Sequence, residues 1–145
     1  MVTAFDVAAC ILEKMGPVSH MKLQKLLYYA QAWSLVWEDK PLFPEPIQAW
    51  VNGPVVPELY DALKGNFTIS PETLGRKGDP ESLATTEKDV IDRVIEFYGP
   101  KNTQWLSDLT HMELPWQQAR AGIGPGTRSE QEISLASMSE YYSGL

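Results

Sequence analysis

Few residues of this sequence combine a reactive side chain with a spacing that would support a reaction. The chain of 145 residues has one cysteine, Cys10, and two histidines, His20 and His111, which lie far apart. His111 begins a His-x-Glu pair, as in zinc deaminases, but that chemistry also needs a downstream pair of cysteines. A single cysteine likewise excludes an internal disulfide and any zinc site built on cysteine pairs. We therefore predict no catalytic residue, no metal site and no cofactor.

Other motifs of catalytic or phosphate-binding proteins are absent or incomplete. The chain has no Gly-x-Ser-x-Gly nucleophile elbow, and Cys10 falls on the apolar side of the first expected helix, where a thiol is usually buried and inert. The glycine-rich segment 121–127, AGIGPGT, lacks the Gly-Lys-Ser/Thr ending of a phosphate-binding loop and predicts a surface loop. The motifs therefore favour a binding protein over an enzyme.

The charge balance disfavours nucleic acid as a partner. Twelve Lys and Arg residues against 19 Asp and Glu residues give a net charge of −7, so an overall basic surface is lacking. Lys22 and Lys25 begin the second expected helix after a short turn, as in a helix-turn-helix protein. That helix is rich in Leu, Tyr and Trp and has no Arg. We interpret it as a core helix with two solvated lysines.

The elements that must position these residues are mostly helical. A first amphipathic helix is predicted between Thr3, which has an acidic residue three positions on, and Gly16. A second helix, over about 20–38, is apolar nearly all round and must be packed on several sides. Later helices are predicted to begin near Pro57, Thr86, Asn102 or Thr103, Pro115 and Ser137.

A small β element is predicted in the middle of the chain. Residues 41–46, PLFPEP, contain three prolines and cannot be helical. Residues 47–51 alternate as in a half-buried strand, and Asn52-Gly53-Pro54 predicts a tight turn. Residues 66–86 are rich in turn formers and predict either a mobile excursion or one extra strand around 67–69. The expected fold class is mainly α (α+β): one compact helical domain, 1–145, with a central apolar helix and a small β-hairpin or short-strand element.

The aromatic content suggests where a partner would bind. Five Trp, six Tyr and four Phe residues are many for this length, and several lie beside expected turns. Aromatic side chains are common both in cores and at protein interfaces. The candidate partner-binding residues are Phe43, Trp50, Asn52, Phe67, Trp116, Tyr141 and Tyr142.

Three sequence blocks together resemble a known family. The blocks MKLQKLLYYAQAWSL, PLFPEPIQAWVNGPVVPELYDALKG and LSDLTHMELPWQQAR occur in this order between residues 21 and 120. They resemble the Panacea domain, which is found in SocA-like antitoxins and phage-associated GepA-type proteins. The motif residues, for which we expect structural roles, are Leu23, Lys25, Leu26, Tyr28, Tyr29, Trp33, Gly53, Pro54, Val55, His111, Glu113 and Pro115. We expect His111, Glu113 and Trp116 to tie the helix around Trp105 to the next helix.

The resemblance implies an antitoxin that binds and neutralises a cognate toxin, and we expect an adjacent gene to encode that toxin. Some SocA-like members also hand the toxin to a cellular protease, which makes a protease a second expected partner. The alternative is a prophage-associated, DNA-binding transcriptional regulator. No apolar run is long enough to span a bilayer, so we expect a cytoplasmic protein without a membrane partner.

Overall fold

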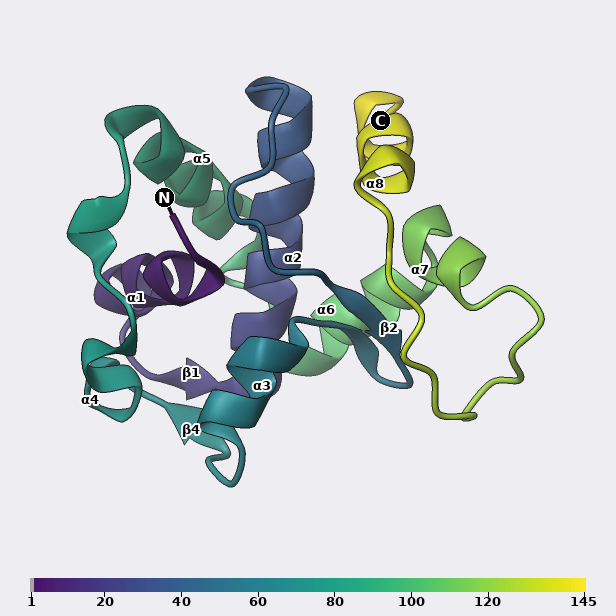
Figure 1. The fold of residues 1–145 in the computed structure, drawn as a ribbon, viewed down its shortest axis with the longest axis horizontal. Helices are drawn as coiled ribbons and strands as arrows, with labels where there is room; N and C mark the ends of the chain where they lie inside the picture. Colours follow the sequence, from purple (N-terminus) through teal and green to yellow (C-terminus); the bar gives the residue numbers. More distant parts are fainter. Residues whose placement is uncertain (1) are drawn as a thin grey trace.

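Helix α2 (His20–Trp37) is the central element of the computed structural model, which describes residues 2–145. Its first turn is capped by Ser19, whose Oγ accepts a hydrogen bond of 3.1 Å from the Lys22 amide. Side chains on all sides of α2 are buried, which confirms the predicted central helix. The helices packed against it are α1 (Ala4–Met15), α5 (Thr85–Tyr98), α6 (Thr103–His111) and α8 (Leu135–Ser143) (Figure 1).

The fold class is mainly α with a minor β part, as predicted. Within residues 2–145 the structure has eight α-helices and two antiparallel sheets of two strands each. The predicted capping box of α1 is present, because Thr3 and Asp6 exchange side chain to backbone hydrogen bonds. The remaining helices are α3 (Pro57–Leu63), α4 (Pro71–Leu74) and α7 (Leu114–Ala119).

The predicted β-hairpin is confirmed. Strand β2 (Gln48–Trp50) pairs with β3 (Gly53–Val55), with Trp50 opposite Gly53. Residues 131–133 run along the other edge of β2, where the Ala49 amide donates to the Gln131 carbonyl over 2.8 Å. The hairpin is therefore hydrogen-bonded on both sides of β2 and lies against α2 and α6.

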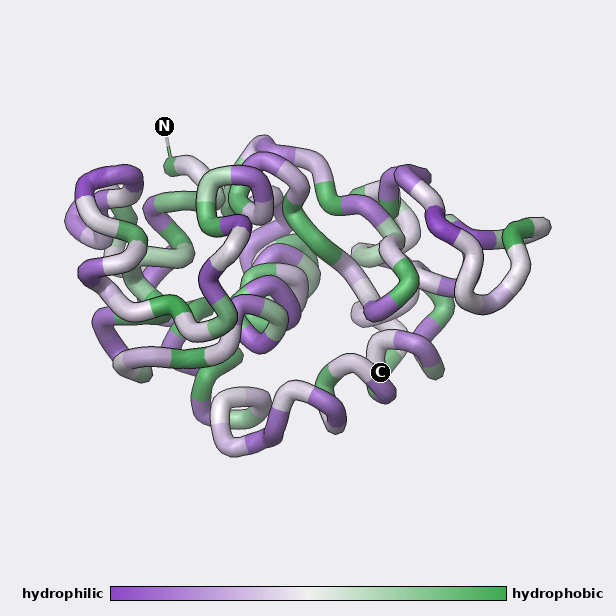
Figure 2. The backbone as a smooth tube through the Cα atoms, turned by 90° about the horizontal axis from the view of Figure 1, so that it is seen from below, coloured by the Kyte–Doolittle hydropathy of each residue, from purple (hydrophilic) through white to green (hydrophobic). Residues whose placement is uncertain are grey.

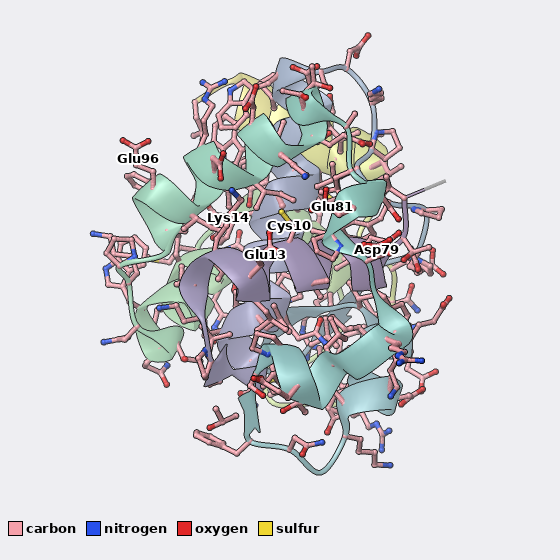
Figure 3. All side chains as sticks on the ribbon, turned by 90° about the vertical axis from the view of Figure 1, so that its left-hand side faces the viewer. Cys10, Glu13, Lys14, Asp79, Glu81 and Glu96 are labelled. Carbon is pink, nitrogen blue, oxygen red and sulfur yellow. The ribbon has the colours of Figure 1, made fainter. Side chains whose placement is uncertain are left out.

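Residues 66–86 contain the extra strand that was one of the two alternatives for this segment. Strand β4 (Thr68–Ile69) pairs with β1 (Val18–Ser19) just before α2. The chain then continues through α4 and two short 3₁₀ turns that pack along α1, where the Asp79 amide donates to Asp6 Oδ1 over 2.8 Å. Figure 3 shows the stretch that carries Asp79 and Glu81 beside the helix that carries Cys10.

The helices predicted to begin near Thr86, Pro115 and Ser137 begin one to two residues earlier, at Thr85, Leu114 and Leu135. Helix α5 begins at Thr85, because the Glu87 side chain accepts a 2.7 Å hydrogen bond from the Ala84 amide. Helix α8 begins at Leu135 after the capping side chain of Ser134, and Ser137 lies in its first turn. Between α7 and α8, the loop of residues 121–128 stands away from the body of the molecule (Figures 1 and 2).

Candidate functional site

A buried cluster of hydroxyl groups and one carboxylate joins three parts of the chain. The Tyr29 hydroxyl donates to Glu113 Oε1 over 2.7 Å, and the Tyr142 hydroxyl donates to the same oxygen over 2.8 Å. The hydroxyls of Tyr28 and Tyr142 are 2.9 Å apart. These bonds link α2, the residue between α6 and α7, and α8. The tyrosine pair in the first sequence block and the Glu in the third are therefore parts of one network.

Burial dominates the electrostatics of this cluster. Loss of solvent raises the pKa of Glu113, and the hydrogen bonds from Tyr29 and Tyr142 oppose that rise. Burial also raises the pKa of Tyr29, with the nearby Glu113 charge adding to the effect, so its hydroxyl stays protonated and remains a donor. Among residues 2–145 the ion pairs are Lys14 with Asp92 and Lys88 with Glu81. Glu113, which is 5% exposed, has no basic side chain within ion-pair distance in that part of the chain.

Glu113 is one of the residues that line an open groove of about 700 Å³, which we call the aromatic groove. The rings of Trp33 and Trp37 stack with their centroids 5.1 Å apart. The Trp33 indole N–H donates to the Tyr98 hydroxyl over 2.9 Å, which fixes that ring. The residues that line the groove are Trp33, Trp37, Arg93, Val94, Glu96, Phe97, Tyr98, Trp105, Leu109, Glu113 and Leu145.

Large apolar side chains are exposed around the aromatic groove. Phe97 is 59% exposed, Trp105 is 39% exposed and Leu145 is 71% exposed. Two basic groups lie over ring faces, since the Arg93 guanidinium is 3.7 Å from the Trp37 centroid and Lys101 Nζ is 4.8 Å from the Trp105 centroid. Figure 3 shows Glu96 pointing from the outer end of α5 into solvent. The groove therefore has aromatic walls, basic groups at its edge and a carboxylate inside.

A second surface, which we call the hairpin face, gathers three of the predicted partner-binding residues. It consists of two hollows of about 440 and 380 Å³ that share Met21 and Tyr60. One hollow contains Trp50 and Asn52, and the other contains Phe67, which is 84% exposed. Trp50 and Tyr60 meet edge to face, with their ring centroids 4.9 Å apart.

The other predicted partner-binding residues lie elsewhere. Phe43 and Tyr142 are 2% and 1% exposed, so neither presents its side chain to a partner in this structure. Phe43 is buried because the Gln31 side chain hydrogen-bonds to the Phe43 backbone and holds it against α2. Tyr142 is buried because its hydroxyl points inward and donates to Glu113. Tyr141 and Trp116 are half-buried.

His111 and Trp116 hold the hairpin against the helices. Their rings lie 4.2 Å apart, which joins the end of α6 to α7. In addition, the Trp116 indole N–H donates to the Trp50 carbonyl over 2.9 Å, and His111 Nε2 lies 3.0 Å from the Val51 carbonyl. The third sequence block therefore also fixes the turn in the second block, a contact that sequence reasoning did not foresee.

The prediction that Lys25 is solvated is wrong. Its side chain is fully buried and passes Gly53, where an added Cβ would lie 2.5 Å from Lys25 Cε. Its Nζ donates to the Pro54 carbonyl over 3.3 Å, and burial lowers the pKa of Lys25 to about 7. Lys22 is half-buried and donates to the Gly99 carbonyl over 2.7 Å. The glycine of the turn therefore makes room for a lysine that no sequence pattern marked as buried.

The remaining motif residues mostly have packing roles. Pro54, Val55 and Pro115 are buried beside the hairpin and at the start of α7. Leu23 and Leu26 are fully buried on α2. No sequence pattern indicated the aromatic groove, because it forms only where Trp33 and Trp37 of α2 lie near Trp105 of α6.

Within residues 2–145 no group of three or more His, Cys, Asp and Glu side chains is placed to hold a metal ion. None of the helices in the described part of the chain is both long enough and apolar enough to cross a bilayer.

Comparison with known proteins identifies the family. The family described as "Antitoxin SocA-like, Panacea domain" matches residues 23–117. The chain is also similar to "Antitoxin SocA" of Caulobacter vibrioides (strain NA1000 / CB15N), with 39% identity in an alignment that covers 87% of this chain and 73% of that protein. No solved structure gives a significant match.

The fold and the two surfaces define a small, mainly helical domain with exposed aromatic side chains. The chain belongs to the SocA-like antitoxin family with a Panacea domain. The resemblance predicted from the three sequence blocks is thereby confirmed. Membership supports an antitoxin role and suggests a regulatory protein that is not an enzyme.

Proposed function

We propose that this protein neutralises a cognate toxin by direct contact in the cytoplasm, and that the aromatic groove is the contact surface. The observation that carries the proposal is the set of exposed rings around one open groove, with Phe97 59% and Trp105 39% exposed. Exposed aromatic side chains at a hollow are typical of interface hot spots, because they bury a large area with little loss of conformational entropy. The family's antitoxin role supplies the kind of partner.

The aromatic groove fits this role better than the hairpin face does. Its rings come from α2, α5 and α6. Helices α2 and α5 are joined there by the stacked rings of Tyr29 and Tyr98 and by the Trp33 to Tyr98 hydrogen bond. The larger hollow of the hairpin face is lined by charged side chains of both signs, among them Asp61, Lys64 and Arg128. Rigid apolar walls lose less entropy on binding than long charged side chains do.

The net charge of −7 suits a basic partner. Toxins that act on RNA or nucleotides need positive charge at their substrate sites. An acidic protein that covers such a site would be steered toward it and would exclude the substrate.

Co-expression with the neighbouring gene tests the proposal. Wild-type protein should restore growth and form a complex on gel filtration. Phe97→Ala and Trp105→Ala should weaken both effects. The control is Phe67→Ala, which removes an even more exposed ring, 84% exposed, from the hairpin face and should leave neutralisation intact. Lack of rescue and of any complex with the wild-type protein would contradict the proposed function. If Phe67→Ala is the only variant that loses rescue, the toxin binds the hairpin face and not the aromatic groove.

The same experiment separates two related functions. If the toxin disappears from cells and no complex accumulates, the protein acts as an adaptor for a cellular protease. If the purified protein shifts its own promoter DNA in a salt-dependent way and gives no rescue, it is a DNA-binding regulator.

A further inference from the structure

The geometry points to Glu113 as a recognition residue: the aromatic groove takes a Lys or Arg side chain from an apolar segment of the bound protein, and the cationic head meets the Glu113 carboxylate. The inference builds on the proposed function, since the bound protein would be the toxin. It adds the chemistry by which this groove selects what it binds.

The first argument is that Glu113 is buried without a counter-charge. Buried carboxylates in proteins are normally paired with a basic group or a metal, because an unpaired charge loses its hydration without compensation. Glu113 is 5% exposed, and its Oε1 accepts only the neutral hydroxyls of Tyr29 and Tyr142. Glu113 is also one of the residues that line the aromatic groove, so a group that enters the groove comes next to it.

The second argument is that the nearby basic residues are engaged elsewhere. The Arg93 guanidinium lies over Trp37, and Lys101 Nζ lies near the ring faces of both Phe97 and Trp105. Neither forms an ion pair with Glu113 in the described residues. The carboxylate of Glu113 is therefore not neutralised by these basic residues and can pair with a basic side chain of a bound protein.

The third argument is the match between the groove and a basic side chain. Lys and Arg have apolar stems that pack along apolar walls, and their charged heads are attracted to aromatic faces as well as to carboxylates. The walls of the groove are the rings of Trp33, Trp37 and Trp105, and its inner charge is Glu113. An uncharged side chain would cover the carboxylate and leave it unpaired, while an acidic one would be repelled.

A purely structural role for Glu113 must be separated from this one. Its two hydrogen bonds hold α2 and α8 together, and the side-chain oxygen of Gln can accept both of them. Glu113→Gln therefore keeps the acceptor and removes the charge. A structural role predicts that this variant binds as the wild type does, and a recognition role predicts that it does not.

The experiment uses two small probes of nearly the same shape, the n-butylguanidinium ion and neutral n-butylurea. The chain has five tryptophans, so their indole N–H signals in NMR spectra report the place of binding. Trp33, Trp37 and Trp105 report on the aromatic groove, and Trp50 and Trp116 serve as internal controls near the hairpin. We expect n-butylguanidinium to shift the groove signals with an affinity about tenfold higher than that of n-butylurea, since one gained charge pair is worth about that factor.

Glu113→Gln should bring the affinity for n-butylguanidinium down to that of n-butylurea. Equal binding of the two probes to the wild type would overturn the inference, as would shifts at Trp50 and Trp116 alone. The comparison of the two probes on the wild-type protein tests the inference even if Glu113→Gln does not fold. A charge preference without neutralisation in cells would contradict the proposed function alone. Neutralisation without a charge preference would contradict this inference alone.

Discussion

Two buried ionisable groups, Lys25 on helix α2 and Glu113 packed against that helix, have opposite surroundings. Around the aromatic groove, Glu113 receives two hydroxyl hydrogen bonds and still borders open space. Under the hairpin, Lys25 is fully enclosed and donates to one carbonyl, that of Pro54. Neither group has an oppositely charged partner among residues 2–145. A buried charge that borders open space is available for recognition, whereas an enclosed one affects only folding and its pH dependence.

The largest expected effect tests how tightly Lys25 is enclosed. Gly53 has a φ of +120°, and an added Cβ would lie 2.5 Å from Lys25 Cε. Gly53→Ala should therefore lower the free energy of unfolding by about 3 kcal/mol, from backbone strain and overpacking together. Urea denaturation measures this. The control is Gly122→Ala, at a φ of +83° with no atom within 4 Å of the added carbon, which should lose only about 1 kcal/mol. Equal losses would show that Lys25 can move aside.

The next effect is the pH dependence caused by Lys25. Its pKa in the folded state is about 7, lower than the model-compound value of 10.5, because burial disfavours the charged form. The unfolded state therefore binds more protons between these values, and stability rises with pH. From pH 7 to pH 9 the gain should be about 2 kcal/mol. Lys25→Met should remove this rise in urea titrations at each pH. A parallel rise in the variant would assign it to other groups.

Glu113 should make the free energy of unfolding fall as pH rises, which is the opposite of the effect expected from Lys25. Burial raises its pKa above 4.5, so the folded state holds its proton longer than the unfolded state does. Its contribution to stability is complete below pH 4.5 and is lost as pH rises through the folded-state pKa. Glu113→Gln should abolish this decline in denaturation curves collected in that acidic range. A decline that persists in the variant would mean that other carboxyl groups cause it.

A smaller effect concerns the hydroxyl groups that hold Glu113. Tyr142→Phe removes a donor to Glu113 and the hydrogen-bonding partner of the Tyr28 hydroxyl. Thermal or urea unfolding should show a loss of about 1–2 kcal/mol. Tyr141→Phe changes the neighbouring, half-buried tyrosine and should have little effect. If the two variants behave alike, the hydroxyl network does not stabilise the junction of α2 and α8.

The smallest expected effect is at the edge of the aromatic groove. Phe97 is 59% exposed, so Phe97→Ala should change the free energy of unfolding by no more than about 0.5 kcal/mol. Circular dichroism during urea unfolding measures this. A larger loss of unfolding free energy would show that the Phe97 ring stabilises the fold. A loss of neutralisation in Phe97→Ala would then reflect lower stability and not a lost contact with the toxin.

Local sequence patterns were sufficient to predict several elements. The Thr3 and Asp6 pair is a short-range feature that appears in the structure as predicted. The turn predicted at Asn52-Gly53-Pro54 lies at residues 51 and 52 instead, since Gly53 and Pro54 already pair with β2 as part of β3. Helix starts at Thr85 and Leu135 were less predictable, because several Ser and Thr residues in succession offer equivalent caps. The burial of Phe43 was not predictable from its position beside prolines, since it depends on Gln31 from α2.

The sequence by itself determined the helical class, the central apolar helix, the hairpin and the family. Hydrophobic periodicity, helix caps, turns and motif blocks each depend on residues that are close together in the sequence. Only the tertiary structure decided which side chains are enclosed and which stay open. Lys25 is buried because a glycine 28 positions later leaves space for it, and Glu113 receives hydroxyls from α2 and α8. The aromatic groove exists because three helices place their rings around a shared gap. Such contacts depend on packing between distant segments, which no local pattern contains.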